Sequence, residues 1–375
     1  MEGEVRPPMD RDNLTGRHVN IPEKKYARLR TLLMRRQQKA VRDFPAEARI
    51  ARNLLQNIQF DAIRAMFQGI NNRASGITRK PTDDQPHSRV SSLPKAPSNS
   101  VTRADVFLVD PTIQNRHGRT VTMKQLASLN AILINLRTPS LVYLSMLHKK
   151  PRPLIKTEMR LAKYRLFDFY RALFHEMGHA YAFVDTRDRV IGKSRFAVEQ
   201  SGIGLKALAE IPVEGTQRIK RGMLTDSEYW VEGFNELQTF YRMEEYLNHH
   251  SLRFEDIQVN QEDLPGQFNI SLNFNSYRGA TLAVKRVIEY VSETSEVPRA
   301  DVFNAVTKTF QTKGGRKILF KALMDILGPE LVKRIRHTPA SGWDSDLLSH
   351  DILTHLKTNP KTVERLEDLM TRPGT

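Results

Sequence analysis

The sequence predicts an α+β protein that is mainly helical and carries one small sheet. Between residues 161 and 184, large apolar side chains recur at intervals of three and four residues, which is the spacing of one helix face. Short apolar segments that favour strands precede this run, and helical patterns punctuated by glycine fill residues 280–335. Apolar residues at helical spacing before residue 70 add an N-terminal helical extension to the predicted fold.

A basic N-terminal region of residues 1–70 is the first predicted unit. Residues 1–22 show little periodicity, and we expect a flexible tail there. Residues 23–43 and 46–69 both have apolar side chains at helical spacing, with Pro45 between them. The two helices could form a hairpin that packs on the rest of the protein. They could instead bind a nucleic acid or a membrane surface through their charged faces.

A disordered linker is predicted for residues 71–103, where Ser, Pro, Asn and Thr are frequent and large apolar residues are few. It separates the N-terminal region from a larger domain, residues 104–375. Within that domain residues 123–130 look helical, and Arg137–Ser140 has a turn signal. Three short apolar segments are predicted strands: Asp105–Val109, Ala131–Leu136 and Leu141–Met146.

The pattern His-Glu-x-x-His occupies residues 175–179, inside the long helical run. On a helix, His175 and His179 are one turn apart, so both imidazoles leave the same face and can bind one metal ion. Glu176 lies roughly 100° around the helix from His175, where its carboxylate can take a proton from a water molecule that the metal activates. Two neutral imidazoles beside one base suit Zn²⁺, whose catalytic sites keep three protein ligands and one open position. The alternative is that both histidines are ordinary residues of a half-buried helix.

A third ligand must come from another element, because the motif does not continue into an extended form with a further histidine. A glutamate is the better expectation, and Glu232 lies in a second helical pattern that spans residues 229–241. Glu236, one turn later, could bind the metal instead or hydrogen-bond a metal-bound imidazole. The acidic candidates are Glu199, Glu210, Glu214, Glu228, Glu232 and Glu236. Three tyrosines are candidates for stabilising an oxyanion: Tyr229, Tyr241 and Tyr277.

The HExxH pattern followed by Trp230-Val231-Glu232-Gly233-Phe234 resembles the gluzincin metallopeptidases, as in aminopeptidases that carry W-L-x-E-G-F. The resemblance implies that His175, His179 and Glu232 are zinc ligands and that Glu176 is the general base. The chain departs from those aminopeptidases, because Trp and Glu are one residue closer and over fifty residues separate His179 from Glu232. Their Gly-x-Met-Glu-Asn motif, which binds a substrate amine, is absent. The Glu-x-x-x-Glu pair gives a weaker resemblance to toxin proteases of the lethal-factor type.

The gluzincin resemblance also implies a zincin-like fold, with a small sheet above the active-site helix and a helical C-terminal subdomain of about residues 242–375. An edge strand of that sheet, for which Leu141–Met146 is the candidate, could bind an extended peptide. An ordinary buried strand is the alternative for this segment. Residues 185–228 contain several glycines, and we expect loops and short helices there. Residues 345–372 are expected to add one or two helices.

The formal charge of +16 is concentrated near the N-terminus, where residues 1–103 hold 20 Lys and Arg against 10 Asp and Glu. This excess favours an acidic partner, which could be a protein, a nucleic acid or an anionic membrane surface. Cysteine is absent, which excludes disulfides and thiolate ligands. No apolar N-terminal segment resembles a secretory signal, and no stretch is long enough for a transmembrane segment. We expect a cytoplasmic protein, or one exported without a cleaved signal peptide as some effectors and toxins are.

Two classes of function fit these features. The first is a zinc-dependent peptidase that hydrolyses peptide bonds of a protein or peptide substrate. An endopeptidase is favoured because no motif that binds a chain terminus is visible, and a carboxypeptidase or aminopeptidase is the alternative. The second is a basic helical adaptor that binds nucleic acid, acidic protein or membrane through residues 23–70, with an inactive zincin-like domain.

Overall fold

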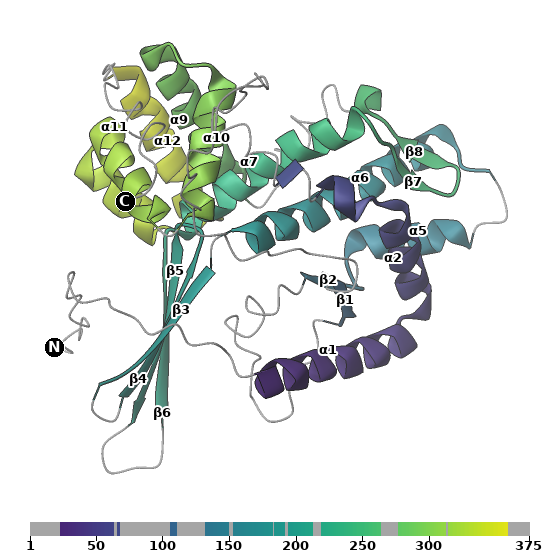
Figure 1. Cartoon of the computed structure of the whole chain (residues 1–375). Coiled ribbons are helices and arrows are strands. Elements are labelled where there is room, and N and C mark those ends of the chain that lie inside the picture. The colour runs from purple at the N-terminus through teal and green to yellow at the C-terminus, as the bar shows by residue number, and fades with distance from the viewer. Residues whose placement is uncertain are drawn as a thin grey trace, which may run out of the picture.

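The computed structural model describes residues 23–63, 66–67, 106–110, 132–149, 153–182, 184–191, 194–212, 219–263, 277–312 and 314–358. Most of these residues are helical and the strands form small sheets, which agrees with the predicted, mainly helical α+β class (Figure 1). The predicted tail at residues 1–22, the linker at 71–103 and the helix at 123–130 lie outside the described residues.

Helices form both ends of the described part of the chain, and most of the strands lie between them. The helices are α1 (Glu23–Asp43), α2 (Pro45–Asn57), α5 (Pro139–His148), α6 (Lys156–Tyr181), α7 (Glu228–Leu247), α9 (Arg278–Ser295), α10 (Arg299–Gln311), α11 (Gly315–His337) and α12 (Trp343–Thr358). The strands are β1 (Val106–Val109), β2 (Ile132–Asn135), β3 (Val184–Ile191), β4 (Ser194–Ser201), β5 (Gly204–Pro212), β6 (Ile219–Asp226), β7 (Leu252–Phe254) and β8 (Ile257–Val259). A short 3-10 turn follows β8 at Gln261–Asp263.

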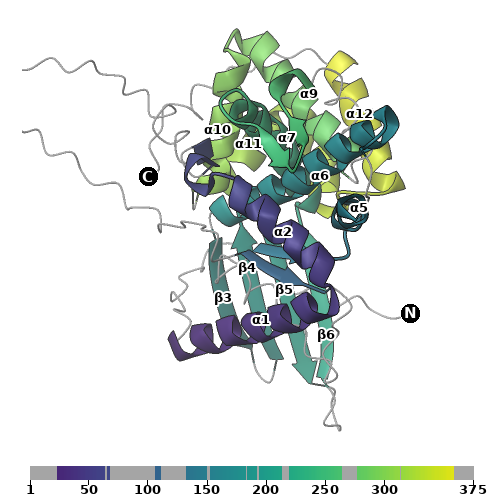
Figure 2. The same cartoon turned by 90° about the vertical axis from the view of Figure 1, so that its right-hand side faces the viewer.

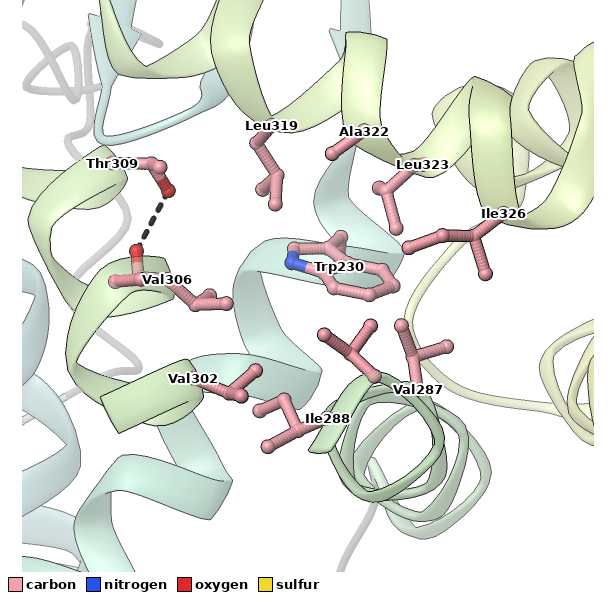
Figure 3. Close-up of a pocket in the computed structure, with 12 residues that line it drawn as sticks. Trp230, Val287, Ile288, Val302, Val306, Thr309, Leu319, Ala322, Leu323 and Ile326 are labelled. Atoms are coloured by element: carbon pink, nitrogen blue, oxygen red, sulfur yellow. Dashed lines mark hydrogen bonds between the residues drawn. The ribbon is translucent and has the colours of Figure 1, made fainter. Parts of the chain in front are cut away.

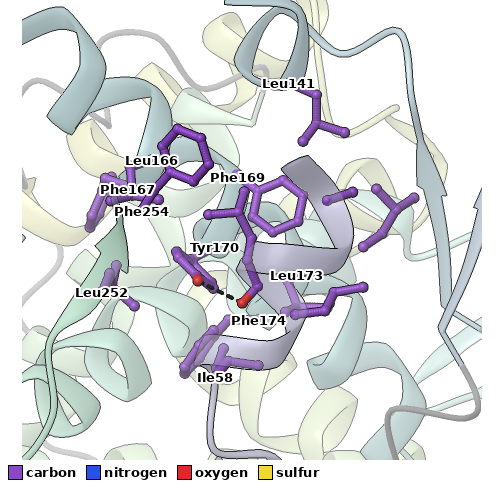
Figure 4. Close-up of a cluster of buried hydrophobic side chains, with 14 of the residues drawn as sticks. Ile58, Leu141, Leu166, Phe167, Phe169, Tyr170, Leu173, Phe174, Leu252 and Phe254 are labelled. Atoms are coloured by element: carbon purple, nitrogen blue, oxygen red, sulfur yellow. Dashed lines mark hydrogen bonds between the residues drawn. The ribbon is translucent and has the colours of Figure 1, made fainter. Parts of the chain in front are cut away.

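The helix α2 packs against α6 and extends its hydrophobic core. Leu54 of α2 is fully buried, and its carbonyl oxygen accepts a hydrogen bond from the hydroxyl of Tyr170 at 2.8 Å (Figure 4). The packing of α2 on other elements agrees with the first of the two predicted alternatives, while binding through a charged face stays a prediction. The helix is shorter than the predicted residues 46–69, because it ends at Asn57. The backbone then turns extended at Ile58, with φ −93° and ψ 140°, and this side chain enters the core.

The helix α1 packs beside the strand β1 and exposes a basic outer side. Leu33 is buried, and the side chain of Gln37 accepts a hydrogen bond from the backbone N–H of Leu108 at 2.9 Å. Three basic side chains on this helix are exposed: Arg35, Lys39 and Arg42. Binding of an acidic partner by this surface stays a prediction.

The two strands β1 and β2 confirm two of the three predicted strands, and they pair in parallel. The third predicted strand, Leu141–Met146, is wrong, because this segment belongs to the helix α5. The side chain of Thr138 accepts a hydrogen bond from the backbone N–H of Leu141, and Pro139 occupies the first turn. The residues that carry the turn signal therefore start a helix. Leu141 and Leu144 are buried at helical spacing, so this segment offers no edge strand to a peptide.

The segment between α6 and α7 is a four-stranded antiparallel sheet in the order β3-β4-β5-β6. The prediction of loops and short helices for residues 185–228 is therefore wrong. Gly202, one of the glycines on which that prediction depends, forms the two-residue turn between β4 and β5 together with Ile203. It has a φ of 58°, which glycine adopts without strain. The sheet lies between α6 and α7 along the chain, and these two helices pack against each other. Figures 1 and 2 show the sheet extending away from the C-terminal helices.

The helix α7 lies between two hydrophobic cores. Its N-terminal half buries Trp230 and Phe234 in a core built with α9, α10, α11 and α12. Figure 3 shows the indole of Trp230 among apolar side chains of α9, α10 and α11. Its C-terminal half buries Phe240 and Tyr246 in the core around α6. The side of α7 that meets α6 is polar, with Glu232, Asn235 and Glu236.

The C-terminal helices α9, α10 and α11 confirm the helical prediction for residues 280–335. The helix α12 overlaps the predicted helical segment 345–372, whose last residues lie outside the described part of the chain. The hairpin β7–β8 is buried against the core of α6 and not against these helices. Among the helices described, none has the length and apolar content that crossing a membrane requires.

Candidate metal centre

The helix α6 places the two histidines of the motif on one side, as predicted. Leu173 and Met177 anchor this part of the helix in the core. The imidazole of His175 is buried, whereas that of His179 is partly exposed. The Nε2 atoms of the two rings lie 3.2 Å apart, and the rings meet edge to face with 78° between their planes. Both nitrogens therefore point into the same small space.

The helix α7 brings the carboxylate of Glu232 to these nitrogens. Its Oε2 atom lies 3.1 Å from Nε2 of His175 and 3.3 Å from Nε2 of His179. In a tetrahedral zinc site with bonds of roughly 2.0–2.1 Å, neighbouring ligand atoms lie about 3.3 Å apart. The three atoms thus have the mutual spacing of three corners of such a site. In the described residues His175, His179 and Glu232 form a group that could hold a metal ion.

When the imidazole of His175 is neutral, its Nε2 atom is an acceptor. Its Nδ1 atom lies 2.8 Å from Oε2 of Glu236. An ionised carboxylate only accepts hydrogen bonds, so Nδ1 must carry the proton and donate it. In the neutral imidazole Nε2 then has a lone pair, and that lone pair faces the acceptor oxygen of Glu232. A second proton on His175 or a metal cation would match these two facing acceptors.

Glu236 lies on the opposite side of His175 from Glu232 and hydrogen-bonds the imidazole. It is fully buried, and its other oxygen, Oε1, accepts a hydrogen bond from Nη1 of Arg171 at 2.5 Å. Both oxygens of Glu236 are therefore engaged away from the acceptor group. Of the two predicted alternatives for Glu236, the geometry matches the residue that orients a metal-binding imidazole.

The pKa values of His175, Glu232 and Glu236 are all shifted towards the charged forms. Burial lowers the pKa of His175, but hydrogen bonds with Glu232 and Glu236 outweigh it and raise the pKa to about 10. Burial alone would raise the pKa of both glutamates, whereas the hydrogen bonds with His175 hold both values below their usual range. Two carboxylates around one buried imidazole thus require a positive charge, which a second proton or a metal cation supplies.

A close approach of α6 and α7 holds the group together. Asn235 donates a hydrogen bond from Nδ2 to the backbone carbonyl oxygen of His175 at 2.7 Å. A Cβ atom at Gly178 would lie 1.9 Å from Oδ1 of Asn235, which no real contact allows. Glycine in the second variable position of the motif therefore lets Asn235 reach the backbone of the neighbouring helix.

Glu176 and one of the three candidate tyrosines lie at the mouth of this group. Glu176 is exposed. The ring of Tyr277 stacks on that of His175, with 5.7 Å between centroids and 16° between planes. Burial raises the pKa of Tyr277 to about 12, helped by the negative charges of Glu232 and Glu176. Glu176 therefore lies near enough to Tyr277 for its charge to act on the tyrosine hydroxyl.

The other two candidate tyrosines lie elsewhere. Tyr229 is fully buried, and its hydroxyl is hydrogen-bonded to that of Ser349 at 2.7 Å. Tyr241 packs edge to face on Phe303, 4.9 Å between centroids, in the core of the C-terminal helices. The structure brings neither of them to the histidines.

Of the remaining acidic candidates, only Glu228 has a described side chain, and it is not part of the group. Glu199 lies in β4, Glu210 lies in β5, and Glu228 occupies the first turn of α7. Glu214 lies outside the described residues.

Arg171 and Asn235 contact the group but were not among the residues predicted from the sequence. Arg171 precedes His175 by one helical turn, so its place on the same helix face is a signal that could have identified it. Asn235 has no such signal, because its partner is a backbone carbonyl on another helix.

Comparisons of the chain with protein-family models, with curated proteins and with solved structures find no match.

Proposed function

We propose that the chain is a zinc-dependent peptidase with His175, His179 and Glu232 as metal ligands. The observation that carries this proposal is the convergence of three acceptor atoms 3.1–3.3 Å apart. Two imidazoles and one carboxylate suit Zn²⁺, which such sets bind tetrahedrally with one position left for water or substrate. Zn²⁺ bound there would polarise a peptide carbonyl and lower the pKa of a water molecule towards neutrality.

Glu176 is the proposed general base. It follows His175 directly on α6 and is exposed, so both water and substrate can reach its carboxylate. It would take the proton of the attacking water and pass it to the leaving amine. Tyr277 would donate a hydrogen bond to the substrate oxygen that gains negative charge. Its raised pKa keeps the hydroxyl protonated at neutral pH.

The test separates metal binding from turnover. Glu176→Gln should keep one zinc per chain and lose peptide hydrolysis, because the amide cannot accept the proton. His175→Ala should lose both zinc and activity. Glu244→Gln is the matched control, since Glu244 is an exposed glutamate of α7. Zinc is measured by atomic emission, and hydrolysis is measured on a mixture of unfolded proteins. If Glu176→Gln hydrolysed peptides at the wild-type rate, Glu176 could not be the general base.

The same digestion distinguishes the kinds of peptidase. An endopeptidase, which we propose, produces internal fragments that mass spectrometry maps to cuts within each chain. Stepwise shortening from one terminus would instead identify an exopeptidase. Wild-type protein that binds no zinc and cleaves nothing would favour the adaptor function for residues 23–70.

A further inference from the structure

A chain of polar contacts runs from the start of α5 to the metal-binding face of α6. The hydroxyl of Ser140 donates a hydrogen bond to Oδ2 of Asp168 at 2.8 Å. The other carboxylate oxygen, Oδ1, accepts from Nη2 and Nε of Arg171 at 3.1 and 3.3 Å. Arg171 also donates to Glu236, whose second oxygen contacts Nδ1 of His175.

We propose that Arg171 is a positioning residue of the metal centre, acting on His175 through Glu236. This inference rests on the proposed metal site but not on the peptidase activity. The guanidinium holds one carboxylate oxygen of Glu236, so the other oxygen stays on Nδ1 of His175. The imidazole then keeps the orientation in which Nε2 points at Glu232 and His179.

The burial of Glu236 makes this partner necessary. Its side chain is 0% exposed, so water cannot replace a lost hydrogen bond to Oε1. Without the guanidinium, the carboxylate would be free to rotate about its terminal torsion, which has a broad energy profile. An imidazole that follows this rotation would no longer hold Nε2 at 3.1 Å from Glu232. Loss of Arg171 should therefore weaken metal binding without touching a ligand.

The shape of the arginine side chain explains why Asp168 is part of the arrangement. The guanidinium is a planar fork, and it contacts Glu236 through Nη1 and Asp168 through Nη2 and Nε. With Asp168 on one side, the plane of the fork is fixed before it meets Glu236. A lysine is a point charge without this planar geometry, so it can restore only part of the effect.

The experiment compares metal binding by Arg171→Gln, Arg171→Lys and the control Arg165→Gln. Arg165 lies on the same helix and stacks on Tyr164. Zinc affinity is measured by competition with a chromogenic chelator, and the ligand geometry is read from the visible spectrum of the Co²⁺-loaded protein. Thermal unfolding of each metal-free variant shows whether it is folded.

Arg171→Gln should bind zinc about 10–100-fold more weakly, with an altered cobalt spectrum. Arg171→Lys should recover part of the affinity, and Arg165→Gln should match the wild type. The inference would be overturned if Arg171→Gln bound zinc as tightly as the wild type and gave the same cobalt spectrum. If this variant does not fold, Asp168→Asn takes its place. A smaller loss of affinity in Asp168→Asn then supports the inference, and an unchanged affinity overturns it.

The outcomes for the wild type separate this inference from the proposed function. The wild type could bind zinc but hydrolyse no peptide, which would refute the peptidase. If Arg171→Gln then weakened zinc binding, the positioning role would still be supported. A wild type that binds neither zinc nor cobalt would refute both.

Discussion

Two buried charge clusters flank the first turns of α7, and they differ in how their hydrogen-bonding groups are matched. At the end of β6, the carboxylate of Asp226 meets Arg336 through two guanidinium nitrogens and Arg316 at 2.9 Å. The hydroxyl of Ser227 donates to the same carboxylate at 2.5 Å. Arg316 also donates to the hydroxyl of Ser227 and to the backbone carbonyl oxygen of Ile203. Acceptors face donors throughout this cluster.

The group around His175 is built in the opposite way. When His175 is neutral with its proton on Nδ1, its Nε2 and Oε2 of Glu232 are two acceptors that face each other, and Nε2 of His179 lies 3.2 and 3.3 Å from them. The Asp226 cluster is therefore complete as it stands, and its contacts join β6 and the β4–β5 turn to α11. The histidine group is matched only when a proton or a cation is added, so it could hold a metal ion.

Removing the carboxylate of Asp226 should have the largest effect on stability. Asp226→Ala leaves two partly buried guanidiniums without their partner, so the free energy of unfolding should fall by about 3–5 kcal/mol. The measurement is urea denaturation of the metal-free protein. Lys357→Ala, at an exposed end of α12, is the control and should change little. If the free energy of unfolding fell by less than about 0.5 kcal/mol, the cluster would contribute no more than a solvent-exposed ion pair does.

Zinc should stabilise the wild type and not the variant that lacks Glu232. At a free zinc concentration of 100 times the Kd, binding should add about 2.7 kcal/mol to the free energy of unfolding. Glu232→Ala should lose this gain, because only two ligands remain, whereas Asp226→Ala should keep it if folded. Thermal unfolding with and without zinc measures the difference. An equal zinc gain in wild type and Glu232→Ala would refute Glu232 as the third ligand.

The effect of pH on stability should separate the two clusters by sign. The pKa of His175 is raised from 6.5 to about 10, so its contribution to the stability of the metal-free protein is fully present below about pH 6.5. This contribution is lost as the pH rises towards 10. Asp226 has a lowered pKa, so its contribution is present above the unfolded value of 3.8 and is lost only in acid.

Zinc and the second proton of His175 compete for the same place, so zinc binding at pH 8 should release about one proton. Calorimetry of zinc binding in buffers of different ionisation enthalpy measures this number. His175→Gln should remove the loss of metal-free stability between pH 6.5 and 10. A wild-type protein whose metal-free stability is flat over this range would contradict the raised pKa.

Local periodicity was sufficient for part of this protein. The helix α6 follows from apolar side chains at helical spacing, and the spacing of His175 and His179 places both imidazoles on one face. Both facts depend on residues within one or two turns, so the sequence alone contains them. The helices α9, α10 and α11 were predictable for the same reason. The expectation of a glutamate from this helix also had a local basis, because Glu232 and Glu236 both lie in the second helical pattern.

The sheet β3–β6 and the helix α5 were decided by contacts between distant residues. The four strands are defined by pairing with one another, and the ladder partners of β3 and β4 are up to 17 positions apart, as in Val184 with Ser201. Leu141–Met146 has a strand-like composition, but a cap at Thr138 and packing of α5 on α6 make it helical. Short apolar segments carry too little local information to choose between these states.

The separate roles of Glu232 and Glu236 likewise come only from the tertiary structure. Both glutamates occupy equivalent positions one turn apart on α7, so nothing local distinguishes them. Their roles differ because α6 crosses close to α7 at Gly178 and Asn235, which leaves one carboxylate on each side of His175. The sequence determined which helices carry the charged groups. Only the packing of these helices decided which groups meet.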